Sequence, residues 1–266
     1  MSERITSKNL DEVVRRNALI HRELEQNAQT VRAHFNQMQL SSSPQLALQI
    51  LVSHGLIQMP IENQYLSGAI FVKNGARIPV INTALSRVNQ YFTAWHEVYH
   101  LLFDRVSFDI MIDADTIMEE RKAEHFASLM LLGNLLPYYC NLSDMDFQSK
   151  VFHCMSAFQA PYKAVLIGLY EGACQNGNQV LRDLVLGCFD HQPADITDRF
   201  QALGLDDTLV QPSYVINLNP LYTKIKQTQR QQPYLSYHED NVDYFNKLLK
   251  ELYKSVDRNN DKLTCI

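Results

Sequence analysis

The chain has 266 residues, of which 46% are hydrophobic and 20% are charged, so it has enough apolar material for a buried core and the composition of a soluble globular protein. Its net charge of -5 at pH 7 argues against constitutive nucleic-acid binding, because proteins of that class present a basic face. We therefore expect no direct nucleic-acid partner, while a basic protein partner is compatible with the charge.

The cysteines and the N-terminus indicate the cellular compartment. The five cysteines are scattered and none forms a CxxC pair, so neither a disulfide framework nor a cysteine-rich zinc site is indicated, and free thiols suit a reducing cytosol. Residues 1–16 are polar and lack the apolar core of a signal peptide. No apolar run approaches the roughly 18 residues of a membrane span. We predict a cytoplasmic protein with no membrane partner.

Residues 9–39 carry the pattern of a long helix. Asn9 and Glu12 resemble a capping pair, and the apolar residues after them recur at helical spacing. The apolar stripe is thin, so this helix either packs across a larger body or pairs with a partner protein. We favour packing within the chain and assign residues 1–44 to an N-terminal helical unit.

A short helix and a β-hairpin follow. Ser43 can cap the helix, Pro44 suits its first turn, and Gly55 can end it. The hairpin is GAIFVKNGARIPVIN (68–82), in which Asn-Gly at 74–75 favours a tight turn with positive φ at both central residues. Pro79 cannot donate to a β-ladder, which predicts that the second arm is an edge strand or is exposed at that point.

Helical patterns dominate the remainder of the chain. Helices are expected near 86–103 and 116–132, the second with Thr116 and Glu119 as a capping box and Gly133 as its stop. These two helices carry the residues of chemical interest.

The C-terminal half is less informative. Residues 145–172 are expected to be helical, with a turn at Ala160 and Pro161. Residues 173–233 mix short helical patterns with turn residues, and an amphipathic helix is expected near 238–255. No motif beyond residue 172 indicates a chemical function.

The segment YFTAWHEVYHLLFD (91–104) contains the pattern HExxH. On a helix, His96 and His100 lie one turn apart on one face, so both can direct an imidazole nitrogen at one metal ion. Glu97 projects beside them and can accept a proton from a water at that site. Because the chain has nine histidines, a chance match is the alternative. The hairpin directly before this helix favours a zinc peptidase, in which an edge strand aligns an extended substrate.

A catalytic zinc needs a third protein ligand and one open position. The extended pattern HExxHxxGxxH is absent, because Phe103 and Val106 occupy the positions of its glycine and third histidine. The helix near 116–132 offers four candidates instead, namely Glu119, Glu120, Glu124 and His125.

Helical spacing discriminates among these candidates. Glu120 shares a stripe with small and apolar residues, so we expect it on the core-facing side, where a metal would satisfy its carboxylate. Glu119 suits a helix cap, and Glu124 and His125 fall nearer the solvent edge. Glu120 is therefore the first choice for the third ligand, and Glu124 remains the alternative.

Four segments together resemble the ImmA/IrrE metallo-endopeptidases of bacteria, phages and mobile elements. The resemblance covers about residues 45–172 and is more specific than HExxH alone. The matching segments are IPVIN (78–82), YFTAWHEVYHLLF (91–103), EERKAEHFASLML (119–131) and AFQAPYKAVLIGLYE (157–171).

The resemblance implies a role for each matched residue. His96 and His100 match the two histidine ligands of zinc, Glu97 the catalytic glutamate, and Glu120 the third ligand. Asn82 matches the asparagine at the strand end, with a structural or substrate-positioning role.

The chain departs from the family pattern at three positions. Tyr99 replaces the glycine of HELGH, Glu124 the asparagine of ExxAN, and Gly133 the proline of LLMP. None of these changes removes a ligand or the glutamate base.

The fold implied is α+β, with a mostly helical zincin-like core at residues 45–172 and a small antiparallel sheet beside the HExxH helix. A helical or irregular C-terminal extension follows at residues 173–266. The division into domains is then 1–44, 45–172 and 173–266, and the oligomeric state stays open.

The function implied is that of a zinc-dependent endopeptidase, with a regulatory cut in a DNA-binding repressor or a similar protein. Its cofactor is Zn²⁺ and its partner is a protein or peptide substrate. The alternative is a non-proteolytic regulator that binds a protein through the same cleft. For the donor that stabilises the oxyanion the sequence offers Tyr162, Tyr170, His125 and His153, without choosing among them.

Overall fold

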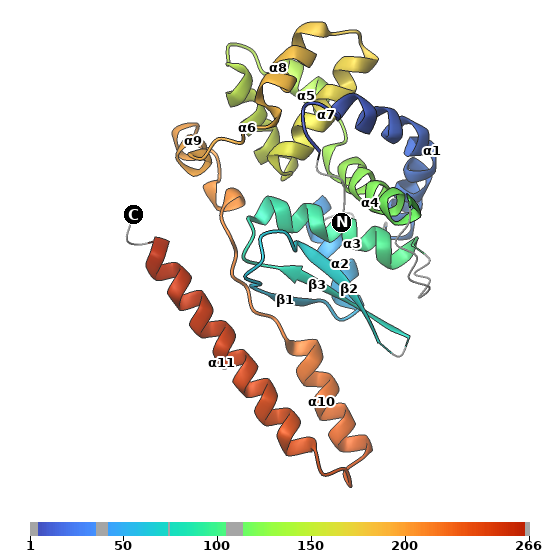
Figure 1. The fold of residues 1–266 in the computed structure, drawn as a ribbon, viewed down its shortest axis with the longest axis vertical. Coiled ribbons are helices and arrows are strands. Elements are labelled where there is room, and N and C mark those ends of the chain that lie inside the picture. Colours follow the sequence, from blue (N-terminus) through green and yellow to red (C-terminus); the bar gives the residue numbers. More distant parts are fainter. Residues whose placement is uncertain (1–4, 36–41, 74, 105–113, 264–266) are drawn as a thin grey trace.

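The computed structural model describes residues 5–35, 42–73, 75–104 and 114–263. Its central element is α3 (Arg87–Leu102), which lies between a small sheet and a layer of helices (Figure 1). The fold is of the α+β class and mainly helical, as the sequence predicts. The remaining helices in this layer and beside it are α1 (Leu10–His34), α2 (Ser43–Ser53), α4 (Ala114–Leu132), α5 (Leu135–Asn141), α6 (Phe147–Phe158), α7 (Tyr162–Gln175), α8 (Gln179–Phe189) and α9 (Ile196–Ala202).

Helix α1 packs along α4 and also contacts α7, so the N-terminal helix packs within the chain, as the sequence predicts. The buried face of α1 includes Asn17, whose side-chain amide donates to Glu171 of α7. Asn9 is the N-cap residue, as predicted, but its side chain accepts from the Thr6 amide at 2.7 Å and makes no side-chain cap bond. The end of the predicted helix, 36–39, lies outside the described residues.

The N-cap of α2 lies one residue before the predicted Ser43. Ser42 is the N-cap, and its backbone amide donates to Gln45 Oε1 at 3.1 Å. Ser43 bonds to the core instead: its hydroxyl donates to the Met130 carbonyl at 2.7 Å and accepts from Trp95 Nε1 at 3.1 Å. Gly55 follows the helix with a φ of 81°, in the left-handed conformation expected at its end.

The sheet has three strands in the order β1-β3-β2. Strands β2 (Gly68–Lys73) and β3 (Ala76–Asn82) form the predicted hairpin, although Asn74 of the turn lies outside the described residues. Strand β1 (Ile57–Met59) pairs with β3 in parallel and was not predicted. The sheet is therefore mixed rather than antiparallel.

Pro79 lies in the central strand and is buried, so the prediction of an edge or exposed position is wrong. The amide of Asn82 points towards β2, where it bonds to the Ser67 carbonyl, so amides at odd positions of β3, including 79, point towards β1. Strand β1 pairs with β3 only from Val80 onward. The missing N–H of Pro79 therefore falls just before this ladder begins.

The predicted helices around the chemical site are present as α3 and α4. Gly133 follows α4 with a φ of 29°, consistent with the predicted stop. The capping box is not supported, because Glu119 accepts a hydrogen bond from the Tyr99 hydroxyl at 3.0 Å, and the side chain of Thr116 lies outside the described residues. Helix α5 was not predicted. Its Pro137 occupies the first turn, where proline is tolerated.

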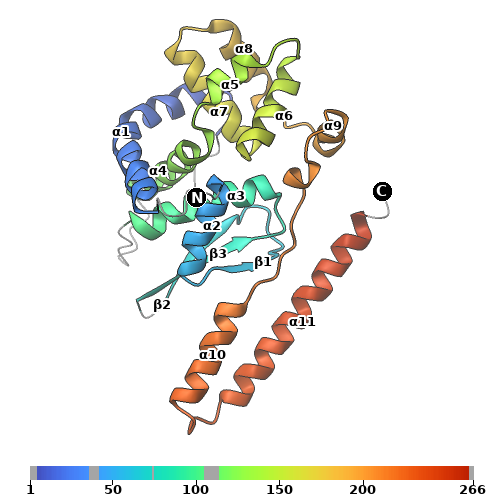
Figure 2. The ribbon, with the colours of Figure 1, turned by 180° about the vertical axis from the view of Figure 1, so that it is seen from behind.

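The region 145–172 forms α6 and α7, and the predicted turn at Ala160 and Pro161 separates them. The C-terminal region continues through α8, α9 and a 3-10 helix, η2 (Asp207–Val210), before an extended segment. Helices α10 (Asn219–Gln231) and α11 (His238–Leu263) then form a hairpin that projects from the body (Figure 2). Helix α11 is longer than the sequence predicts.

The extended segment 211–217 ties the C-terminal region to the sheet. Asn217 forms a bridge with Gln58 of β1, and Pro212 forms one with Ser86 before α3. Thr83 donates its hydroxyl to the Val215 carbonyl at 2.8 Å. This segment covers the outer side of β1. Within the described part of the chain, no strand pairs with the outer side of β2.

No described helix combines the length and the apolar character needed to cross a membrane. The four described cysteines are free thiols.

Asn82 holds the loop that leads into β2. Its buried amide nitrogen donates to the backbone carbonyls of Ile61, Asn63 and Leu66 at 2.8–3.2 Å. Its oxygen accepts from the amides of Ile61 and Ala84, both at 2.9 Å. The predicted role of Asn82 was structural or substrate-positioning, and these bonds show a structural one.

Replacing Asn82 with aspartate should destabilise the protein by about 3 kcal/mol or more, because a carboxylate oxygen would face three carbonyl oxygens in a buried site. Urea unfolding followed by the fluorescence of Trp95, the single tryptophan, measures this loss. Asn134→Asp, at an exposed N-cap without a side-chain cap bond, is the matched control. Equal stability of the Asn82→Asp and Asn134→Asp variants would contradict this role.

Candidate metal centre

Helices α3 and α4 bring three nitrogen and oxygen donors together. His96 Nε2 and His100 Nε2 lie 3.0 Å apart. Glu120 of α4 places its carboxylate oxygens 3.4 Å from His96 Nε2 and 3.5 Å from His100 Nε2. Among the described residues, this is the group of histidine, cysteine and carboxylate side chains whose spacing could hold a metal ion.

The donor spacing fits a tetrahedral zinc ion. Zinc binds nitrogen and oxygen at about 2.0–2.1 Å, so neighbouring ligands of a tetrahedral site lie about 3.3 Å apart. The three separations of 3.0, 3.4 and 3.5 Å scatter around this value. Two imidazoles and one carboxylate also match the donor types of catalytic zinc sites, which leave a fourth position open.

His100 is oriented by a carboxylate behind it. Its Nδ1 lies 3.0 Å from Asp104 Oδ2, which favours the tautomer with the proton on Nδ1 and leaves Nε2 free to bind a metal. Arg77 of β3 also fixes the end of α3, since its guanidinium donates to the carbonyls of His100 and Leu101 at 2.5 and 3.1 Å. Neither residue was predicted from the sequence. Only the position of Asp104, one turn beyond His100, could have indicated its role.

Glu97 lies beside the donors and is 4% exposed. Burial, opposed in part by the charge of His96, raises the pKa of Glu97 to about 7. Gly68 of β2 makes this position possible, because a Cβ atom there would lie 2.9 Å from Glu97 Oε1 and 2.5 Å from Thr93 Cγ2. Gly68 lets the edge strand pass directly beside the carboxylate, a role that was not predicted from the sequence.

The histidines and Glu120 form one coupled electrostatic group. Burial acts to lower the pKa of His96, but its hydrogen bond to Glu120 and the charges of Glu97 and Glu120 outweigh burial and raise that pKa. Burial and the charge of His96 lower the pKa of His100. The hydrogen bond to His96 lowers the pKa of Glu120. The three pKa values are therefore linked, because the charge of a protonated His96 lowers the pKa of both His100 and Glu120.

The sequence-based placement of the four α4 candidates is only partly right. The side chain of Glu120 is 37% exposed, so it does not lie in the closed core as predicted. Glu124 instead pairs with Arg121 at 2.6 Å. His125, expected near the solvent edge, is buried and contacts His21 at 3.2 Å. The predicted core-facing stripe of α4 is confirmed at Ala123, which is fully buried.

Tyr99, which stands at the family's glycine position, is buried between α3 and α4, and its ring centroid lies 5.8 Å from that of His100. Its ring packs against Phe103 and Phe126, with ring centroids 5.9 and 5.7 Å away. Its hydroxyl donates to Glu119. The large side chain therefore fills the contact between α3 and α4.

The four candidate oxyanion donors are spread over different environments. His125 and Tyr170 have other partners, His21 and Asp11 respectively. Tyr162 is buried at the start of α7, and His153 is half-buried on α6. The structure does not bring these four residues together.

No protein-family model, curated protein or solved structure matches the chain. The ImmA/IrrE resemblance therefore stays a prediction from the sequence motifs.

In metal-free protein, Glu97→Gln should raise stability at alkaline pH. The folded pKa of about 7 lies above the unfolded value of 4.5, so the folded state binds more protons between these values and the wild type loses stability as pH rises through this window. Glutamine removes the ionisation. We expect a gain of about 3 kcal/mol at pH 8 and almost none at pH 4.5.

Urea unfolding in chelator at a series of pH values measures this difference. Glu25→Gln, at an exposed position of α1, is the control and should show no such pH-dependent gain. A Glu97→Gln variant that is equally stable as, or less stable than, the wild type at pH 8 would contradict the conclusion that burial raises the pKa of Glu97.

Proposed function

We propose that the protein is a zinc-dependent endopeptidase with a zincin-like core. The observation that carries this proposal is the position of a buried glutamate, Glu97, directly beside three donors at tetrahedral spacing, His96, His100 and Glu120. A purely structural zinc site does not need a general base. Burying a carboxylate that neither binds the metal nor acts as a base would only reduce stability.

The chain's own residues would divide the chemistry as follows. A zinc ion bound by His96, His100 and Glu120 would activate a water and polarise the scissile carbonyl. Glu97 would accept the proton of the attacking water and return it to the leaving amine. Its burial, which raises its pKa to about 7 in the metal-free protein, favours the uptake of that proton. Asp104 would hold the His100 ring in place.

The open edge of β2 would align the substrate. Its outer side has no strand partner in the described part of the chain, so an extended peptide can add to the sheet there. Gly68, the first residue of this strand, lies against Glu97. A peptide on this edge would therefore run past the base. We further propose, on the family resemblance, that the substrate is a DNA-binding repressor or a similar regulatory protein.

The wild type should cleave an unfolded test protein, such as reduced and alkylated lactalbumin, and a chelator should stop the cleavage. Glu97→Gln should lower kcat/KM by at least about 10²-fold, because it removes the general base, while its zinc content equals that of the wild type. Mass spectrometry of the product peptides measures the cleavage rates of the wild type and of Glu97→Gln.

Glu25→Gln, far along the exposed face of α1, serves as the activity control. Cleavage that persists in Glu97→Gln would contradict the proposal. A zinc-loaded wild type that cleaves no unfolded protein or peptide would favour the binding module that the sequence leaves as the alternative.

A further inference from the structure

The edge strand β2 presents alternate residues to its two sides. Gly68 faces α3, because a Cβ atom there would lie 2.9 Å from Glu97 Oε1, and Ile70 packs against the core. The odd-numbered residues of the strand therefore point away from α3. One of them is Phe71, which is 55% exposed. An exposed aromatic ring thus stands on the strand that passes beside the proposed base.

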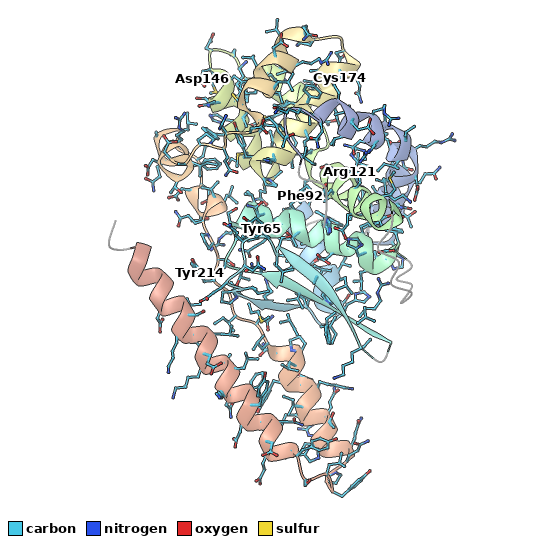
Figure 3. All side chains as sticks on the ribbon, in the orientation of Figure 1. Tyr65, Phe92, Arg121, Asp146, Cys174 and Tyr214 are labelled. Atoms are coloured by element: carbon cyan, nitrogen blue, oxygen red, sulfur yellow. The ribbon has the colours of Figure 1, made fainter. Side chains whose placement is uncertain are left out.

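The side of the sheet that faces away from α3 is apolar. Residues from all three strands share it in register, namely Ile57, Met59, Ala69, Phe71, Ile78 and Val80. A sheet face that is open to water is normally polar. In Figure 3 the sheet lies between α3 and α10, and α10 contacts β1. At β2, by contrast, Ala69 and Phe71 are exposed. The apolar face is therefore open next to the unpaired edge.

The backbone of β2 determines how a peptide adds to this edge. Asn82 of β3 donates its amide to the Ser67 carbonyl, so the N–H and C=O groups at positions 68, 70 and 72 point outward. A peptide that binds these groups continues the pleat, so its side chain opposite Phe71 lies on the apolar side. In antiparallel pairing, the commoner arrangement, this is a non-hydrogen-bonded pair, whose Cα atoms lie about 4.5 Å apart and whose side chains are closest.

We propose that Phe71 is a specificity-determining residue that selects a large apolar side chain, aromatic in the first place, in the bound peptide. The two side chains pack as a cross-strand pair and extend the apolar face. Since Gly68 lies against Glu97, the selected residue is about three positions from the scissile bond, on its N-terminal side in antiparallel pairing. The assignment of the ligand as a substrate peptide rests on the proposed endopeptidase function.

The first test measures equilibrium binding, so it does not depend on catalysis. Three fluorescein-labelled octapeptides of alanine and threonine carry phenylalanine, glutamate or serine at the third position. Each is titrated with zinc-loaded, full-length Glu97→Gln protein, and fluorescence polarisation reports the affinity. We expect the phenylalanine peptide to bind about three- to fivefold more tightly than the serine peptide, as for one aromatic cross-strand pair.

Variants in the same Glu97→Gln background assign the preference to Phe71. Phe71→Lys should reverse it, so that the glutamate peptide binds more tightly than the phenylalanine peptide, because opposite charges then face each other across the strands. Lysine is compatible with an exposed edge strand. Phe71→Ser should abolish the preference for phenylalanine. Tyr253→Lys, at a position of α11 that is 54% exposed, is the matched control and should keep it.

The second test maps cut sites in the unfolded test protein. Sites cut by the wild type should carry a large apolar residue about three positions before the scissile bond. In Phe71→Lys an acidic residue should replace it at that position, while the preferences at other positions stay the same. Mass spectrometry of the product peptides gives both profiles.

Equal or absent binding of the three peptides overturns the assignment, and so does a phenylalanine preference that survives both Phe71→Lys and Phe71→Ser. A wild-type dimer in light scattering that Phe71→Lys dissociates also overturns it, because a second copy would then occupy this edge. A protein that shows the binding preference but cuts no peptide rejects the endopeptidase and retains the role of Phe71. A protein that cuts with a profile independent of Phe71 does the reverse.

Discussion

The packing of Phe126 on α3 fixes how α4 lies against the helix that carries both histidines. The ring of Phe126 has its centroid 6.1 Å from that of Trp95 and 5.7 Å from those of Tyr99 and Phe103. These three residues lie on successive turns of α3 and at its end, so sliding α4 along α3 would break all three contacts together. The fully buried Ala123 allows the close approach. With this register fixed, Glu120 meets the two imidazoles at metal-binding distance.

The same arrangement buries the side chain of Glu97, where the charged form of a carboxylate is unfavourable. Glu97 is buried between α3 and the edge strand, and burial raises its pKa to about 7. The surrounding structure holds it there: Asn82 fixes the loop before β2, and Gly68 leaves room for the carboxylate. Arg77 holds the C-terminal end of α3 through its carbonyl groups. Carboxylates whose pKa is raised by burial in this way cluster at functional sites.

The sequence was informative where local pattern decides structure. The i, i+4 spacing of His96 and His100, the alternation in the hairpin and the long helices all follow from local periodicity. Helical spacing selected Glu120 as the residue that meets the two histidines, but it predicted a core-facing position, and the partial exposure of Glu120 was missed because exposure depends on how distant helices pack. Strand β1 and the central position of Pro79 were missed for the same reason. Three residues that pair in parallel with a distant strand leave no local signal.

The central claim is that His96, His100 and Glu120 form one zinc site, and elemental analysis of purified protein tests it most directly. Protein prepared without chelator should carry close to one zinc per chain. Glu120→Gln should lose most of it. Glu124→Gln, one turn away on the same helix and paired with Arg121, should keep it. A wild type that binds no zinc even when zinc is supplied would contradict the account, and so would a loss in Glu124→Gln as large as that in Glu120→Gln.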